Sequence, residues 1–215
     1  CHQCRLAPSQ TLRLNMLELY GKPTSINVRK VLWLTAVLGL PLQHHAAPSA
    51  ELLRGLNPNT QVPVLREGDF VLWESNSICR YLAARAERDD LLPMAPQARA
   101  RVEQWMDWQA TDLNTAWRAV FMARVRGHAD YPDDARAEAS LVQWNGLMAM
   151  LDAQLAQHAH VAGDAFTLAD IVLGLSTQRW RCTPGNKPAL ANVAAWFERL
   201  RQQPGFAEHV DNGVA

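Results

Sequence analysis

Apolar positions in the first third of the chain follow two periods in turn, which predicts alternating strands and helices. Residues 17–20 have the apolar spacing of a short strand, and a polar turn covers residues 21–25. Apolar residues then recur at helical spacing over residues 28–38. The segment that starts at Met16 is therefore predicted to be a strand, a turn and a helix.

The following segment predicts the rest of an α/β unit. Its expected elements are a weak strand, a short helix, a β-hairpin around Glu67–Gly68–Asp69 and a closing helix, over residues 42–47, 49–56, 62–73 and 76–86. The order β-α-β-α-β-β-α predicts an open α/β sandwich with a mixed four-stranded sheet. This first domain is expected to end near Ala86.

A different pattern begins after the first domain. Residues 87–96 combine a charge cluster with two prolines, which is typical of a linker. No strand pattern follows, so residues 97–215 are predicted to form an all-helical second domain. Thr167, with Asp170 three residues later, resembles a helix capping box. Other helices are expected over residues 102–121, 141–155 and 190–200.

The first fifteen residues and the cysteines suggest no further structured unit. Residues 1–15 show no apolar run and no period, so they are expected to be a disordered leader. Cys1 and Cys4 resemble half of a zinc site, but no second pair follows, and no metal is expected. Four scattered cysteines do not make a disulfide framework, which favours a reducing compartment and therefore a cytoplasmic location.

Composition and charge narrow the range of partners. A hydrophobic content of 48% and 8 tryptophans are typical of a folded globule. The 21 basic and 21 acidic residues cancel, so the chain lacks the basic excess of a protein that binds nucleic acid or an anionic membrane. The longest apolar run, residues 32–40, is far shorter than the ~20 residues that span a bilayer. Small molecules or proteins are the expected partners.

Three places in the first domain carry candidate chemistry. Thr24 and Ser25 lie where the first helix begins, so a hydroxyl there combines with the positive helix end to stabilise a thiolate. The alternative is that one of them only caps the helix. Val62 precedes Pro63, and a cis bond between them would turn the Val62 backbone outward to pair with an extended ligand, although trans is the usual isomer.

The third place is the start of the helix predicted over residues 76–86. Ser75 can cap this helix, and the free backbone N–H groups of its first turn can bind a carboxylate. Glu74 beside them can bind an ammonium group. A ligand with a carboxylate and an amine on one carbon would suit this pair, as would a capped helix with an exposed acid.

Residues 19–31, 57–63 and 72–78 together resemble glutathione S-transferases in both order and spacing. The segment from Ser25 to Val31 is similar to the SxNVxKV-type first motif of bacterial, theta-like members. The resemblance covers nearly everything from Met16 onward, and it extends into the second domain at residues 103–108 and 167–171.

The resemblance implies a thioredoxin-like domain over residues 16–86 that binds glutathione as a co-substrate. Gln61 and Val62 would meet the tripeptide ahead of a cis Pro63, with the Val62 backbone paired to its cysteinyl unit. Glu74 and Ser75 would hold the γ-glutamyl end.

Catalysis is implied at the first helix. Ser25 stands at the position of the theta-like catalytic serine, where it would donate a hydrogen bond to the thiolate. Thr24 and Asn27 remain alternatives, because some bacterial relatives use Thr or Asn in this loop. No cysteine lies there, so the resemblance does not imply an enzyme that forms a mixed disulfide.

Two parts of the implied site are less defined by the sequence. The segment between Pro41 and Asn57 is shorter than in many relatives, which place a basic residue there for the glycyl carboxylate. The helical domain would supply the electrophile pocket, although its two candidate aromatics also fit a core stripe. The candidates are Arg54, His44 and His45 for the carboxylate, and Trp117, Arg118 and Phe121 for the electrophile.

The resemblance implies a homodimeric glutathione transferase that conjugates glutathione to small electrophiles or dehalogenates them. One alternative is a non-catalytic scaffold of the same fold, against which Ser25, Glu74 and Ser75 argue. The other is a glutathione-dependent peroxidase or reductase, which needs only a different electrophile at the same thiolate.

Overall fold

The computed structural model describes residues 16–215, so the predicted leader and the Cys1–Cys4 pair lie outside it. Its first domain contains one sheet with the strand order β2-β1-β3-β4. β1 runs parallel to β2, whereas the β1–β3 and β3–β4 pairs are antiparallel. The predicted mixed sheet is confirmed, and its strands are β1 (Leu17–Tyr20), β2 (Leu42–His45), β3 (Val64–Glu67) and β4 (Phe70–Trp73).

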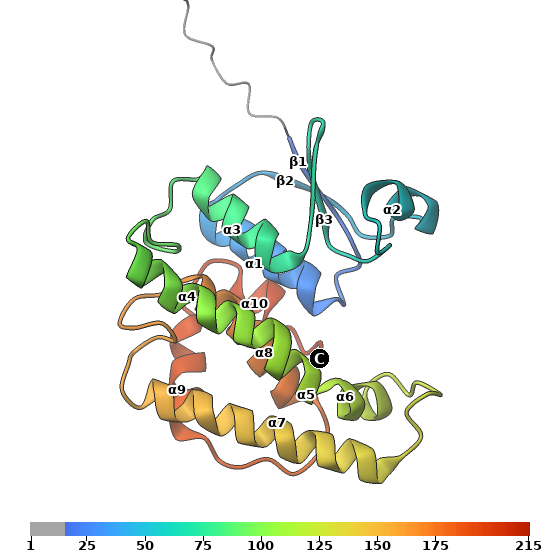
Figure 1. Cartoon of the computed structure of the whole chain (residues 1–215), viewed down its shortest axis with the longest axis vertical. Coiled ribbons are helices and arrows are strands. Elements are labelled where there is room, and N and C mark those ends of the chain that lie inside the picture. The colour runs from blue at the N-terminus through green and yellow to red at the C-terminus, as the bar shows by residue number, and fades with distance from the viewer. Residues whose placement is uncertain (1–15) are drawn as a thin grey trace, which may run out of the picture.

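Helices cover both faces of this sheet (Figure 1). Side chains alternate along a strand, so Leu19 packs toward α1 (Ile26–Leu38) and α3 (Ser75–Arg85). The next residue, Tyr20, belongs to a separate cluster with Leu53 of α2 on the opposite face. α2 is Ala50–Leu56. The thioredoxin-like α/β sandwich expected from the sequence is therefore confirmed.

The second domain is helical throughout its described length, as predicted. It consists of α4 (Pro96–Trp108), the π-helical segment η1 (Gln109–Leu113), α5 (Asn114–Ala116), α6 (Arg118–Arg124), α7 (Asp134–Leu155), α8 (Leu168–Cys182), α9 (Ala191–Leu200) and α10 (Phe206–His209). None of the helices in residues 16–215 has the length and apolar character needed to cross a membrane.

The single long helix expected over residues 102–121 is wrong. The π-helical turn η1 interrupts it, and a second break at Trp117 precedes α6. The residues after α4 include Thr, Asp and Asn, which are weak helix formers. The Thr111 hydroxyl also donates to the Asp107 carbonyl at 2.9 Å, a bond that bends helices.

Other helix ends differ from the sequence expectations by a few residues. α3 begins at Ser75 rather than residue 76, and Ser75 does not cap it, because Glu74 occupies the N-cap position. α9 ends at Leu200, and α10, which the sequence did not predict, starts after Gly205. The predicted capping box at Thr167 is confirmed, with the Thr167 N–H donating to the Asp170 carboxylate at 2.9 Å.

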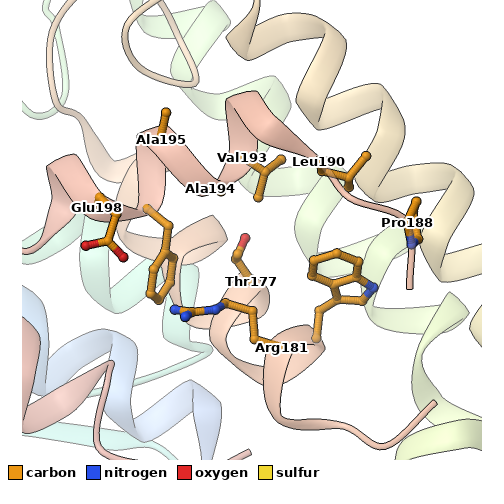
Figure 2. A pocket seen from close by; sticks show the side chains of 10 residues that line it. Thr177, Arg181, Pro188, Leu190, Val193, Ala194, Ala195 and Glu198 are labelled. Carbon is orange, nitrogen blue, oxygen red and sulfur yellow. The ribbon is translucent and has the colours of Figure 1, made fainter. Parts of the chain in front are cut away.

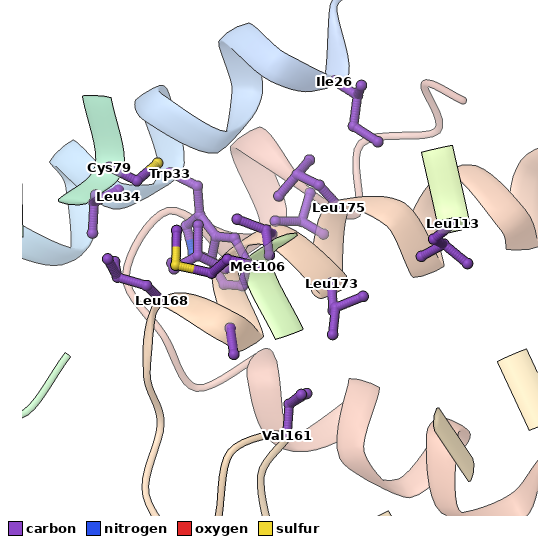
Figure 3. Packing of buried hydrophobic residues seen from close by; sticks show 14 of the residues in the cluster. Ile26, Trp33, Leu34, Cys79, Met106, Leu113, Val161, Leu168, Leu173 and Leu175 are labelled. Atoms are coloured by element: carbon purple, nitrogen blue, oxygen red, sulfur yellow. The ribbon is translucent and has the colours of Figure 1, made fainter. Parts of the chain in front are cut away.

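The two domains share one core along the contact between α1 and α8. Trp33 of α1 is fully buried, and Figure 3 shows apolar side chains of α1, α4 and α8 gathered around its ring. Gly174 of α8 lies against this ring, because a Cβ there would stand 2.9 Å from Trp33 Cζ3. α8 is thereby fixed beside α1, and the candidate catalytic Ser25 is the N-cap residue of α1.

A buried lysine adds a polar link between the domains. Lys30 of α1 donates to Gln109 Oε1 at 2.6 Å and to Asn76 Oδ1 at 3.2 Å. Burial lowers the pKa of this ammonium to about 8, and the neighbouring Cys79 thiol and Glu74 carboxylate act in the opposite direction. Gln109 then donates to Ser176 of α8 at 3.0 Å, so the network joins α1, α3, η1 and α8.

Candidate functional site

Two neighbouring cavities contain most of the residues that the sequence singled out. The smaller one, about 170 Å³, is called here the loop cavity and is lined by Asn27, Asn57, Gln61, Val62, Pro63, Glu74 and Ser75. The larger one, about 580 Å³, is called the helical cavity. Its lining is Lys22, Ser25, Ile26, Asn27, Asn114, Trp117, Arg118, Phe121, Met122, Arg126, His128, Tyr131 and Arg179. Asn27 lines both cavities, so they are adjacent.

The chain before β3 forms one wall of the loop cavity. The Val62–Pro63 peptide bond is cis, as the family resemblance implied. Asn57 holds this segment: its side-chain N–H donates to the Gln61 carbonyl at 2.9 Å, and its oxygen accepts from the Asn59 N–H at 2.9 Å. Internal hydrogen bonds therefore fix this segment.

Gly21, at the end of β1, lets this segment approach closely. Its φ of 149° is rarely adopted by residues with a side chain, and a Cβ there would stand 2.9 Å from Val62 Cβ and 2.5 Å from Val28 Cγ2. Only glycine allows the strand end, α1 and the Val62 segment to meet at this point.

The opposite wall is the start of α3. Glu74 has φ 74° and ψ 111°, a conformation that costs a residue with a side chain about 1–3 kcal/mol. Such strain is concentrated at functional sites. The Glu74 side chain is exposed, and the buried Ser75 hydroxyl lies 3.5 Å from Lys30 Nζ. The free N–H groups of the first α3 turn follow directly.

Ser25 occupies the N-cap position of α1, but its side chain makes no capping hydrogen bond. The capping alternative considered for Ser25 is therefore not what its hydroxyl does. Ser25 and Asn27 both line the helical cavity, whereas Thr24 is exposed and lines neither cavity. Of the three residues weighed for contact with the thiolate, the structure brings together Ser25 and Asn27.

All three candidates for the electrophile pocket line the helical cavity. Trp117 and Phe121 are 8% and 3% exposed, and their rings meet edge to face at 5.2 Å between centroids. They are thus both core residues and cavity walls, so the two alternatives weighed for them do not exclude each other. Arg118, between them in sequence, is exposed.

The three candidates for the glycyl carboxylate line neither cavity, and their role stays a prediction. His44 Nε2 lies 2.7 Å from the Gly21 carbonyl, and His45 Nε2 lies 3.0 Å from Glu18. His45 also stacks on Tyr20. Arg54 is exposed on α2, with its Nε donating to the Ala50 carbonyl at 3.2 Å. Each of the three side chains thus has a local partner in or beside β1 or in α2.

Arg179 is the residue of the helical cavity that sequence reasoning missed most clearly. It lies on α8, is 3% exposed, and has its guanidinium 4.5 Å from the Trp117 ring centroid and 4.1 Å from that of Phe121. Burial, and then the charges of Arg29 and Arg126, lower its pKa to about 9. A cation beside two aromatic rings thus lines the cavity.

The comparisons with known proteins agree with this geometry. Residues 19–90 match the model of the glutathione S-transferase N-terminal domain, and residues 110–204 match that of the C-terminal domain. Glutathione S-transferase GstB of Escherichia coli is 36% identical over 209 residues, which cover 91% of this chain and 98% of the relative. The chain belongs to the glutathione S-transferase family.

Two further members of the glutathione S-transferase family illustrate how far the likeness extends. Glutathione S-transferase 3 of Zea mays is 34% identical over 212 residues, covering 90% of this chain and 93% of the relative. A theta-class glutathione S-transferase from Xanthomonas axonopodis pv. citri, solved with glutathione bound, has a TM-score of 0.84 and 37% identity. The match covers 92% of this chain and 98% of that one.

Besides Arg179, sequence reasoning missed Asn57 as a lining residue of this glutathione S-transferase, although it recognised the turn there. A signal for Arg179 existed: it is a charged residue inside α8, which is buried from Leu168 to Trp180. Arginine is rarely buried without a charged partner, so a buried arginine in such a helix suggests that its charge faces a cavity.

A separate cavity of about 350 Å³ lies between α8 and α9 (Figure 2). It has Arg181 over the Phe197 ring at 4.3 Å, and none of the predicted site residues. Across residues 16–215, no three His, Cys, Asp or Glu side chains gather closely enough to hold a metal ion.

Proposed function

We propose that this protein conjugates glutathione to small electrophiles, with Ser25 stabilising the glutathione thiolate. The observation that carries the proposal is the position of Ser25. Its hydroxyl stands at the N-terminus of α1, is not used for capping, and lines the cavity that adjoins the loop cavity at Asn27. A thiol that enters between the two cavities would meet both this hydroxyl and the positive end of the helix.

The tripeptide would occupy the loop cavity in an extended form. The Val62 backbone, ahead of Pro63, would pair with its cysteinyl unit. Glu74 would bind the γ-glutamyl ammonium, and Ser75 with the first N–H groups of α3 would bind the carboxylate. Gln61 lies next to Val62 in the opposite wall. Strained backbone conformations occur mainly at functional sites, so the positive φ of Glu74 supports a role in binding.

Chemistry then follows from the lowered pKa of the thiol. A free thiol has a pKa near ~8.5, and a hydrogen bond from Ser25 with the helix end would lower it by about one to two units, or ~1.4 kcal/mol each. The sulfur attacks the electrophilic carbon, a C–S bond forms, and the leaving group departs with its electron pair. The thiol proton passes to solvent. Positioning the two reactants side by side lowers the barrier further.

Replacing Ser25 tests the proposal. In Ser25→Ala, the ultraviolet absorbance of bound thiolate should titrate about one to two pH units higher than in wild type, and kcat at neutral pH should fall about 10-fold or more. Glutathione affinity, measured by calorimetry, should change little. Thr24→Ala is the matched control, because Thr24 is exposed and lines neither cavity, and it should behave as wild type.

Other outcomes would redirect or end the proposal. An unchanged titration in Ser25→Ala, together with a raised thiol pKa in Asn27→Ala, would move the role to Asn27. No glutathione binding at millimolar concentration would favour the non-catalytic scaffold instead.

We also propose that the protein is a cytoplasmic homodimer. Free thiols at Cys79 and Cys182 support a reducing compartment. Phe70 is 45% exposed beside Tyr81 on the outer side of the first domain, where a second chain would cover it. Light scattering at micromolar concentration should give the mass of two chains, and the mass of one chain would contradict the dimer.

A further inference from the structure

In the described part of the chain, the helical cavity is lined by basic side chains and by no acidic ones. Four cationic side chains line it, Lys22, Arg118, Arg126 and Arg179, and no Asp or Glu belongs to the same lining. Within residues 16–215, none of the four forms an ion pair or donates a side-chain hydrogen bond.

Arginines elsewhere in this chain are commonly paired. Arg85 lies 2.6 Å from Glu67, and Arg124 lies 3.0 and 2.9 Å from Asp134 and Glu138. The chain has equal numbers of acidic and basic residues, so the unpaired set in the cavity reflects local placement and not a shortage of acids.

Arg179 is the unusual member of the set. A buried guanidinium normally has an acceptor, yet the Nε of Arg179 has none, and its nearest neighbours are the faces of Trp117 and Phe121. The buried indole Nε1 of Trp117 also lacks an acceptor. Arg179 thus lines the cavity without an acidic partner among residues 16–215, and four unpaired cations around one cavity favour an anionic group inside it.

Glutathione itself does not account for four cations. Its γ-glutamyl end is assigned to the loop cavity and its thiolate to Ser25, so only its glycyl carboxylate is left to pair with one of these cations. An electrophile with its own negative charge would be repelled by that thiolate, and cations around the cavity would remove this penalty.

We propose that the electrophile is a carboxylate-bearing planar molecule, whose carboxylate binds Arg179 and whose ring or plane lies against Trp117 and Phe121. This inference rests on the proposed function. Arg118 and Arg126, both exposed at the cavity, attract the anion from solvent. In the reaction the sulfur displaces a halide: a C–S bond forms, the carbon–halogen bond breaks, the halide leaves with the electron pair, and the carboxylate is unchanged.

A pair of isosteric substrates tests the charge. 4-Chloro-3,5-dinitrobenzoate and 4-chloro-3,5-dinitrobenzamide differ at one substituent, and each kcat/KM is divided by that compound's uncatalysed rate constant with glutathione. Wild type should favour the benzoate about 10-fold or more after this correction. Arg179→Gln should lower the benzoate value about 30-fold and the amide value less than about 3-fold, and Arg179→Lys should restore part of the loss.

Controls separate charge recognition from misfolding. Arg181→Gln removes an arginine from the same helix outside the helical cavity, and it should change neither substrate. Arg118→Gln and Arg126→Gln alter exposed side chains, so they should fold normally and each lower the benzoate preference several-fold, with a loss that disappears at high salt.

Binding of the products distinguishes this inference from the proposed function. The glutathione conjugates of the benzoate and the benzamide are titrated by calorimetry, and the benzoate conjugate should bind about 10-fold more tightly. Equal binding, equal loss of both substrates in Arg179→Gln, or a matching loss of glutathione affinity would overturn the inference. If neither substrate is turned over but the conjugates still differ, the proposed catalysis fails and the charge selectivity stands.

Discussion

The two cavities that meet at Asn27 are built in opposite ways. Apart from Asn27, the lining of the loop cavity comes from residues 57–75, and special backbone conformations shape it: a cis bond before Pro63 and a positive φ at Glu74. The helical cavity draws on α1, α6 and α8, and its walls are aromatic and cationic side chains. The shape of the loop cavity therefore depends on local backbone conformation, and that of the helical cavity on the packing of helices. A variant in one cavity should leave the other unchanged.

The largest expected effect is on the loop cavity. Glu74→Gln should weaken glutathione binding about 10- to 100-fold, because a hydrogen bond between charged groups contributes about 1.5–3 kcal/mol. Glu74→Gly should weaken binding as much, yet raise the free energy of unfolding by up to about 1 kcal/mol, since glycine adopts φ 74° without strain. Calorimetry and denaturant titration measure the two quantities.

Glu87→Gly is a matched control for Glu74→Gly. Glu87 also has a positive φ, 52°, but it follows α3 and lines neither cavity. Glu87→Gly should stabilise the fold to a similar extent and leave glutathione binding unchanged. If Glu74→Gly binds glutathione as wild type does, Glu74 has no role in holding the ligand.

The same contrast explains what the sequence could predict. The sheet, α1 to α3 and the turn, cis-proline and helix-start features of the loop cavity all leave signals in a few consecutive residues. The lining of the helical cavity does not, because Lys22 and Arg179 are 157 positions apart and meet only through the packing of α8 on α1. Trp117 and Phe121 were found through the family resemblance, whereas the signal for Arg179, a charge inside a buried helix, does not say which cavity the residue lines.

His44 and His45 show a second limit of prediction from the sequence. His44 and His45 have the chemistry to bind a carboxylate, and the sequence places them near the expected position. Their nearest partners, the Gly21 carbonyl and the Glu18 carboxylate, lie on β1. Strand pairing, which brings β2 beside β1, gives both histidines these local contacts, and residue type alone does not reveal them.

A smaller effect is expected from the packing that positions the helical cavity. Gly174→Ala would place a Cβ 2.9 Å from Trp33 and 3.0 Å from Leu200, so the helix must shift, at a cost of about 1–3 kcal/mol in the free energy of unfolding. Because α8 also carries Arg179, KM for the electrophile should rise more than Kd for glutathione.

Gly146→Ala is the control for the stability effect of Gly174→Ala. Gly146 lies in α7, and nothing lies within 4 Å of the position that an added methyl group would take. The change should therefore stabilise the protein by about 0.5–1 kcal/mol through helix propensity. Thermal unfolding of both variants measures the difference. Equal stability of Gly174→Ala and Gly146→Ala would show that the α1–α8 contact tolerates a methyl group.

The smallest expected effect concerns Lys30, which links the two halves of the site. Its pKa is about 8 in the folded protein against 10.5 for an ordinary lysine, so above pH 8 the unfolded chain holds a proton that the folded chain releases. The contribution of Lys30 to stability therefore rises with pH. Burial raises the pKa of Cys79 from 9.0 to about 12, which acts oppositely above pH 9.

The window from pH 8 to 9 thus isolates the lysine. Over this range the free energy of unfolding of wild type should rise relative to Lys30→Met, by less than about 1.4 kcal/mol. Lys22→Met, which removes an exposed lysine, should keep the wild-type slope. Denaturant titrations at closely spaced pH values measure the slopes. Parallel curves for wild type and Lys30→Met would mean that the ammonium stays protonated between the domains, with Gln109 and Asn76 stabilising its charge.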